Sequence, residues 1–178
     1  MGVLVETAER MARDAHAAQR RKWGGGPYAE HLRRVAERVA AYPGSTPEMV
    51  AATWLHDTVE DTGLTAAAIE AALGPAVAAL VVELTNPSKG RRDMSRKDRK
   101  AMDRAHLATV SHAAKIIKMF DRIDNLSDPD AAPRTFRGLY AMESVLLADA
   151  VGGADPRLES ELRAAASRFD PALREGEA

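Results

Sequence analysis

Apolar residues recur every three or four positions along most of the chain, a spacing typical of amphipathic helices. The first such stretch predicts a helix from the N-terminus to about residue 21, which the glycine-rich run 24–26 and Pro27 end. A second helix is predicted over 28–42. Thr46, Pro47 and Glu48 then supply an N-cap, a first-turn proline and an acid at the positive helix end. A third helix is therefore expected to begin there and to continue past Leu55.

The remaining helices are separated by caps, glycines and prolines. Thr65 is expected to cap a short helix, and Gly74-Pro75 separates it from the next one, which contains Leu84. Further helices are predicted over 113–126, 134–151 and 155–169, and the segment 86–104 is read as a basic loop leading into an exposed helix. No segment alternates with period two, so no strand is expected. The pattern predicts an all-α fold with one helical domain over 1–169 and a frayed tail over 170–178.

Composition narrows the class of protein. The 178 residues are enough for one domain, and a content of only 4% aromatic residues favours closely packed helices over a sheet. A net charge of −1 gives no field that would attract nucleic acid or an anionic membrane. No apolar run is long enough to span a bilayer, and the N-terminus lacks a signal core. The absence of cysteine excludes disulfides and agrees with a cytoplasmic location. The sequence does not indicate an oligomeric state.

The clearest chemical signal lies at 54–61, where an apolar stretch ends in His56, Asp57, Glu60 and Asp61. On a helix these side chains crowd one face, because they lie three or four positions apart. Three neighbouring carboxylates repel one another, and a divalent ion relieves that repulsion while binding a water. The alternative is an acidic helix end with a satisfied histidine.

A second signal is a polar stripe formed by Lys118, Asp121, Arg122 and Asn125 on an otherwise apolar helix. Such a stripe suits a metal together with a phosphate-bearing ligand that Lys118 would contact. It equally fits the solvent face of an amphipathic helix, and both interpretations stay open.

His31 is the third candidate. A lone histidine near a helix start is more often structural, but Lys22, a glycine-proline loop and Tyr28 precede this one. The other histidines have no such context and are read as surface or packing residues: His16, His106 and His112.

The order His31, His56-Asp57, Asp121 resembles the pattern of HD-domain phosphohydrolases. The segments 19–31, 55–62 and 117–126 are similar to three motifs of the RelA/SpoT hydrolase branch, and the chain is most similar to the small alarmone hydrolases that include the metazoan SpoT homologue. The resemblance covers about residues 8–126. Leu32, Phe120 and a longer glycine loop depart from the family pattern, and the loop leaves base preference open.

This resemblance implies an HD-domain helical bundle that binds Mn²⁺ and a nucleotide substrate. It implies the metal ligands His31, His56, Asp57 and Asp121 and the substrate contacts Arg21, Lys22 and Asn125. The candidate catalytic residue is Glu60, one turn from the metal pair, which would orient or deprotonate the water with the help of Asp61. Arg122 is read as an ion-pairing support. Tyr140 is either a sugar contact or a core tyrosine. The basic segment 89–104 either covers the substrate's phosphates or is a solvated helix.

The expected reaction is hydrolysis of the 3′-diphosphate of guanosine tetra- or pentaphosphate, with release of pyrophosphate. One alternative is an HD phosphohydrolase that acts on a 5′-nucleotide or on an adenine-based or NADPH-like compound. Another is a non-catalytic nucleotide-binding or toxin-neutralising protein, against which the intact pair Glu60 and Asp61 argues.

Overall fold

The computed structural model describes residues 2–128 and 130–170. These residues form ten helices and no strand, apart from one isolated bridge between Arg20 and Pro27. The predicted all-α fold is confirmed. The chain divides into two compact units, 1–89 and 90–178, so the single domain over 1–169 stays a prediction. Of the predicted frayed tail, residues 171–178 lie outside the described residues.

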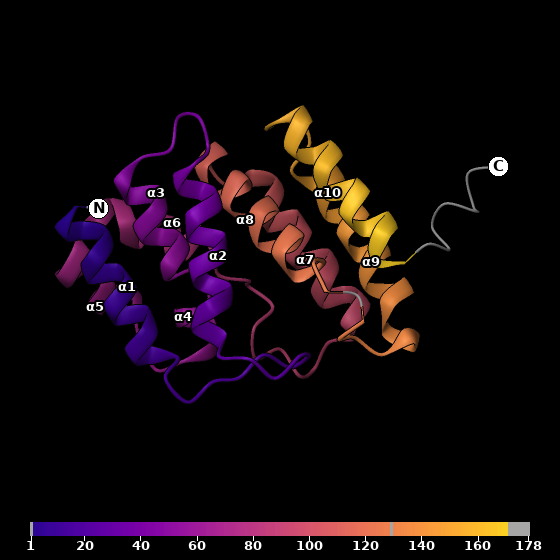
Figure 1. Cartoon of the computed structure of the whole chain (residues 1–178), viewed down its shortest axis with the longest axis horizontal. Coiled ribbons are helices and arrows are strands. Elements are labelled where there is room, and N and C mark those ends of the chain that lie inside the picture. The colour runs from indigo at the N-terminus through magenta and orange to yellow at the C-terminus, as the bar shows by residue number, and fades with distance from the viewer. Residues whose placement is uncertain (1, 129, 171–178) are drawn as a thin grey trace. The chain divides into compact units, whose positions relative to one another are not determined.

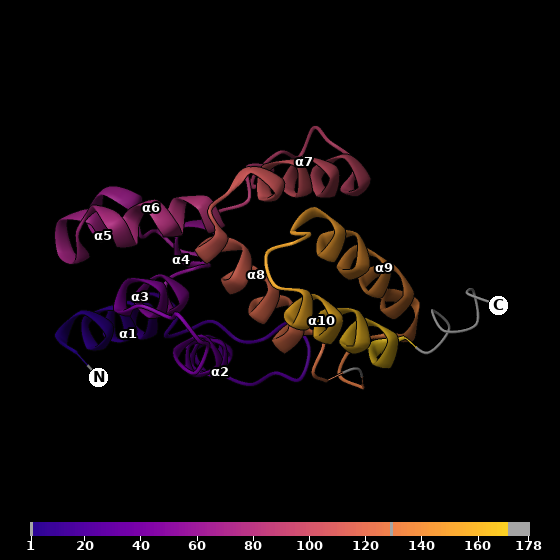
Figure 2. The same cartoon turned by 90° about the horizontal axis from the view of Figure 1, so that it is seen from above.

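The first unit is built around one buried helix. Its elements are α1 (Val3–Ala15), α2 (Tyr28–Ala40), α3 (Pro47–Trp54), α4 (Thr58–Asp61), α5 (Ala66–Leu73) and α6 (Pro75–Leu84). Helix α3 packs against α1, α2 and α6, and Figure 2 shows it between them. Because neighbours cover α3 on several sides, every residue from Met49 to Trp54 is buried. The chemistry-bearing turn that follows α3 is thereby fixed to the core.

The predicted caps of this unit are confirmed. The Thr46 hydroxyl accepts a hydrogen bond from the amide of Met49 at 3.3 Å, and Thr65 accepts one from Ala68 at 3.2 Å. Each oxygen satisfies an amide that has no partner within the helix.

The predicted end of the first helix is wrong, because α1 stops at Ala15 rather than near residue 21. The chain then folds back on itself: the amide of Arg21 donates to the carbonyl of Gly26 at 2.9 Å, and that of Tyr28 donates to Gln19 at 3.0 Å. Gly24 and Gly25 make the reversal with φ angles of 78° and 67°, which other residues rarely adopt. These backbone hydrogen bonds across the loop take the place of the helical turns that were predicted after Ala15.

The third helix also ends earlier than predicted. Helix α3 stops at Trp54, so His56 and Asp57 lie in a turn before α4 rather than on one continuous helix. Side chains take the carbonyls that the next helical turn would use. His56 Nδ1 lies 2.7 Å from the carbonyl of Thr53, and the Thr58 hydroxyl donates to the carbonyl of Leu55 at 2.7 Å.

The second unit contains α7 (Arg96–Thr109), α8 (His112–Asn125), α9 (Arg134–Ala150) and α10 (Pro156–Phe169). Helix α10 packs against α8 and α9, and α7 packs against α9 (Figure 1). The predicted helices over 113–126, 134–151 and 155–169 are confirmed within one or two residues, with Asp155 capping α10 through the amide of Leu158 at 3.0 Å. Residues from Ile116 to Asp124 are all buried, so α8 is the core helix of this unit.

No helix of the described residues is both long enough and apolar enough to cross a membrane.

Candidate metal centre

Three of the predicted metal ligands come together within the first unit. His31 lies in the first turn of α2, and His56 and Asp57 occupy the turn between α3 and α4. One ligand atom from each lies within 4.8 Å of the others. Both imidazoles are fully buried, with ring centroids 5.4 Å apart. The packing of α2 against α3 therefore brings together residues that are 25 positions apart in the chain.

The main chain orients the His56 ring. Its Nδ1 lies 2.7 Å from the carbonyl of Thr53, and because a carbonyl only accepts, Nδ1 carries the proton. Nε2 is then the nitrogen with a lone pair, and it lies 3.0 Å from Asp57 Oδ2. Histidines that bind a metal commonly donate their other N–H to a backbone carbonyl in this way, which fixes the tautomer and the ring plane.

A second contact orients Asp57. The Tyr28 hydroxyl donates a hydrogen bond to Asp57 Oδ2, and the Tyr28 ring meets that of His31 at 5.5 Å. The carboxylate is thus held by a side chain from the start of α2, next to the His31 ligand. This contact links the two segments that supply the ligands.

The donor set fits a divalent metal ion. Two neutral imidazoles and a carboxylate are ligands typical of borderline divalent transition metals. Because these side chains are largely shielded from water, one cation bound by all three would compensate the negative charge of the carboxylate. The set therefore fits the divalent metal that the resemblance implies.

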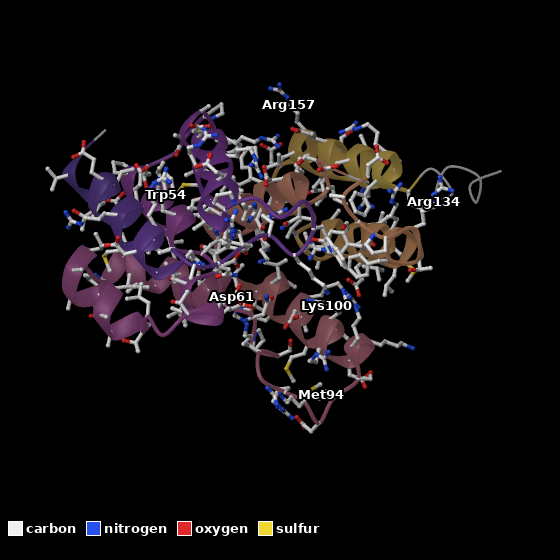
Figure 3. All side chains as sticks on the ribbon, turned by 60° about the horizontal axis from the view of Figure 1, so that its bottom comes forward. Trp54, Asp61, Met94, Lys100, Arg134 and Arg157 are labelled. Carbon is white, nitrogen blue, oxygen red and sulfur yellow. The ribbon has the colours of Figure 1, made fainter. Side chains whose placement is uncertain are left out.

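Glu60 and Asp61 lie on α4, directly after this turn (Figure 3 labels Asp61). The amide of Asn86 donates to Glu60 Oε1 at 2.6 Å. Asp61 accepts from two side chains: Gln19 Nε2 lies 3.1 Å from Oδ2, and Lys89 Nζ lies 2.6 Å from Oδ1. Both predicted catalytic carboxylates therefore have an oxygen placed by a neighbouring segment.

The predicted substrate contacts Arg21 and Lys22 lie in the loop between α1 and α2. The Lys22 ammonium lies 4.7 Å from the centre of the Trp23 ring, and the Lys22 side chain is exposed. The loop also carries Tyr28 and is followed by His31, so both cations are close in the chain to the ligand cluster.

The predicted ligand Asp121 lies on α8 in the second unit, and it is buried. Asn125 Nδ2 donates to Asp121 Oδ1 at 2.6 Å, and Lys118 Nζ lies 3.0 Å from Oδ2. Lys118 and Arg122 are buried too, so the solvent-face interpretation of the polar stripe is wrong. The stripe carries charge in the interior of the unit, where it needs compensation.

The two cations of this stripe, Lys118 and Arg122, form a cationic cluster with Lys100. Burial lowers the pKa of Lys100, and the nearby charges of Arg122 and Lys118 lower it further, against the carboxylate of Asp103 at 3.3 Å. Figure 3 labels Lys100 on α7. Cations that lie this close together favour the binding of an anion. The other basic residues of 89–104 are exposed or half-buried, as a solvated helix predicts.

Tyr140 lies in an aromatic group on α9 and α10. Its ring stacks on Phe136 at 5.3 Å, meets Phe169 at 5.7 Å, and has the Arg122 guanidinium 4.6 Å from its centre. Arg122 also donates to the Ser144 hydroxyl at 3.3 Å. Tyr140 is half-buried, so its interpretations as a sugar contact and as a core tyrosine both stay open.

His16 is a residue whose contacts the sequence did not reveal. It is buried, as a packing role requires, and it stacks on Tyr28 at 4.9 Å. Its Nδ1 also lies 2.5 Å from Gln19 Oε1, and Gln19 contacts Asp61. The only sign of this contact in the sequence is that His16 and Gln19 lie three positions apart.

Comparisons with known proteins identify the family. A family model described as an HD domain matches residues 8–146. The guanosine-3′,5′-bis(diphosphate) 3′-pyrophosphohydrolase MESH1 of Danio rerio is 35% identical over 129 residues, which are 71% of this chain and 68% of that protein. MESH1 of Drosophila melanogaster is 31% identical over 154 residues, 83% of this chain and 84% of that protein. A solved structure described as a metazoan orthologue of SpoT that hydrolyses ppGpp is 26% identical, with a TM-score of 0.83 over 96% of this chain and 97% of that one. The chain therefore belongs to the HD domain family, in the RelA/SpoT hydrolase branch that contains the MESH1 proteins.

Proposed function

We propose that this protein hydrolyses the 3′-diphosphate of guanosine tetra- and pentaphosphate and releases pyrophosphate with GDP or GTP. The observation that carries the proposal is the similarity of 31–35%, over most of the chain, to enzymes named for this reaction. The cluster of the buried His31 and His56 with the half-buried Asp57, followed by Glu60 and Asp61, supplies the groups that the reaction needs.

Mn²⁺ is the proposed metal, and Asp121 is the proposed fourth ligand beside His31, His56 and Asp57. The convergence of the first three supports the site, and Asp121 is supported by its burial and by its place in the third family motif. The bound metal would lower the pKa of the attacking water and offset charge on the phosphoryl group.

Glu60 is the proposed general base, because it follows the ligand turn directly and carries a carboxylate that can take a proton from water. The Asn86 amide holds one of its oxygens and so limits its rotamers. Asp61 lies next to it and assists in orienting the water. In the reaction the water oxygen bonds to phosphorus and the bond from phosphorus to the 3′-oxygen breaks.

The cationic cluster of Lys100, Lys118 and Arg122 is the proposed partner of a substrate diphosphate. A nucleotide with two diphosphates carries several negative charges, and buried or half-buried cations bind such groups more strongly than exposed ones. Arg21 and Lys22 are proposed to contact the base and phosphates, and Asn125 the ribose. A cytoplasmic location stays a prediction from the sequence.

The reaction can be tested with purified protein, Mn²⁺ and a panel of guanosine tetraphosphate, a 5′-monophosphate, an adenine-based alarmone and NADPH. The proposal expects pyrophosphate from guanosine tetraphosphate, with kcat/KM at least about tenfold above the other compounds. Orthophosphate from the monophosphate or from NADPH as the main product would overturn it. Glu60→Gln is the matched control, because it keeps the shape of the side chain and removes the base.

The fourth ligand is tested separately by metal binding. Asp121→Asn keeps the side-chain shape and its contact with Asn125 but loses the charge. Its Kd for Mn²⁺ should rise by about a hundredfold, because an anionic ligand is replaced by a neutral one. Asp128→Asn, an exposed acid beyond the end of α8, serves as the control. Equal Mn²⁺ affinities of the two variants would remove Asp121 from the ligand set.

A further inference from the structure

A hydrogen-bonded chain of two residues leads from the core to Asp61. His16 follows the last residue of α1 and is only 2% exposed. Its Nδ1 lies 2.5 Å from Gln19 Oε1, and Gln19 Nε2 lies 3.1 Å from Asp61 Oδ2. All three residues belong to the first unit, and neither His16 nor Gln19 has a part in the reaction as described so far.

The direction of these hydrogen bonds is fixed. An ionised carboxylate only accepts, so the Gln19 amide must present its NH₂ group to Asp61. The amide oxygen then faces His16 and also only accepts, so the proton of the His16 ring must be on Nδ1. His16 thereby selects one of the two orientations of the Gln19 amide, and the other orientation would place an oxygen against the Asp61 carboxylate.

The other contact of Asp61 is weaker as a restraint. Lys89 approaches Oδ1, but the Lys89 side chain is 52% exposed. Exposed ion pairs of this kind fix a side chain poorly. The Gln19–Asp61 hydrogen bond is exposed as well, but Gln19 is held at its other end by the buried His16, whereas the described residues show nothing comparable for the Lys89 ammonium.

We propose that His16 and Gln19 are positioning residues that hold Asp61 in its working orientation. The inference rests on the proposed function, since it gives Asp61 a part in orienting the attacking water. Neither residue touches the substrate: His16 sets the amide of Gln19, and Gln19 sets the carboxylate. Loss of these two hydrogen bonds should lower kcat, because a misplaced Asp61 carboxylate near the reacting atoms raises the activation barrier and leaves substrate binding intact.

Two substitutions of His16 separate this role from simple packing. His16→Phe keeps a ring against Tyr28, which stacks on His16 at 4.9 Å, but has no donor for Gln19. His16→Asn loses the ring but keeps an N–H near the position of Nδ1. We expect kcat to fall about tenfold in His16→Phe with KM within about twofold, and to stay within about threefold of the wild type in His16→Asn. The reverse order, with His16→Asn the worse variant, would show a packing role and overturn the inference.

Gln19→Met gives a second route that leaves the buried ring in place. It should cause the same loss of kcat as His16→Phe, and the double variant should be no worse than either single one, because all three break the same chain. Losses that multiply in the double variant would mean that the residues act separately, and would overturn the inference.

An NMR readout keeps this test apart from that of the proposed function. The side-chain NH₂ resonances of Gln19, assigned by their absence in Gln19→Met, should shift in His16→Phe and in Asp61→Asn and stay near the wild-type position in His16→Asn. If wild-type protein with Mn²⁺ turned over no guanosine tetraphosphate, the proposed function would fail whatever these resonances did. Unshifted Gln19 resonances in His16→Phe would overturn the positioning chain even in an active enzyme.

Discussion

The two units hold their candidate site residues in different ways. In the first unit His56 and Asp57 lie in a turn between helices, and the carbonyl of Thr53 sets the ring of His56. In the second unit Asp121 lies inside a continuous helix, and the side chains of Lys118 and Asn125 contact its oxygens. A ligand held by the backbone is set as soon as the fold forms. A ligand held by a lysine is set by charge, which a bound cation or anion rearranges. In the first unit the backbone therefore fixes a candidate ligand, and in the second unit charged side chains hold one.

The largest effect is expected when the first unit loses one of its candidate metal ligands. His56→Ala should abolish metal binding and lower kcat/KM by at least about a thousandfold, because metal chemistry contributes several kcal/mol to lowering the barrier. Bound Mn²⁺ per chain and turnover measure the effect. His112→Ala, at an exposed histidine of α8, should leave both unchanged. A His56→Ala protein with full metal content would contradict the assignment of the first unit.

Tyr28→Phe tests the support of a ligand rather than the ligand itself. It removes the hydroxyl that donates to Asp57 and keeps the ring between His16 and His31. Metal affinity should fall by about 10–100-fold, as it does when an outer hydrogen bond to a ligand is lost. Isothermal titration with Mn²⁺ measures it. Tyr42→Phe, just beyond the other end of α2, is the matched control.

Lys118→Met tests the charged contacts of the second unit separately from the candidate ligands of the first unit. It removes the ammonium 3.0 Å from Asp121 and keeps an unbranched side chain of similar length. KM should rise about tenfold, because a buried cation facing an anionic substrate contributes about 1.4 kcal/mol. The affinity for Mn²⁺ should not weaken, because the variant removes from beside the Asp121 carboxylate a positive charge that would repel the metal ion. Weaker Mn²⁺ binding with an unchanged KM would reverse the roles of the two units.

The cationic cluster also predicts a pH effect. The folded-state pKa of Lys100 lies below its ordinary value of 10.5, because burial and then the Arg122 charge disfavour the ammonium. Between the two values the unfolded chain binds the extra proton, so the free energy of unfolding rises with pH across that window. NMR of reductively ¹³C-methylated lysines, with Lys100→Arg for assignment, measures this pKa. Asp103→Asn should lower it further, whereas Asp98→Asn, at an exposed acid of α7, should not.

The smallest effects concern the caps, and they test whether the units unfold together. The Ser111 hydroxyl accepts from the amide of Ala114 at 3.2 Å at the start of α8, and Thr46 caps α3. Ser111→Ala and Thr46→Ala should each lower the free energy of unfolding by about 1 kcal/mol. In a single domain both variants shift one common calorimetric transition. Two transitions, each shifted by its own cap variant, would contradict the predicted single domain.

Local chemistry was predictable wherever one residue type dictates the backbone. Thr46 and Thr65 cap the helices that the sequence assigned to them, because an N-cap depends on a side chain and an amide three positions away. The helix ends after Ala15 and Trp54 were not predictable in the same way. Both depend on hydrogen bonds, across the loop 19–28 and in the turn after α3, that compete with continued helix and that the apolar pattern does not reveal.

The sequence by itself determined the all-α class, most helix bounds and the residue types of the site, because periodicity, caps and motif order are local properties of the chain. Tertiary structure alone decided that the stripe containing Lys118 and Asp121 is buried, and that His31 lies beside His56. It also decided that His16 reaches Asp61 through Gln19. The physical reason is the same in each case: burial and contact between distant segments depend on which helices pack together, and a helical repeat specifies an apolar face without specifying its partner.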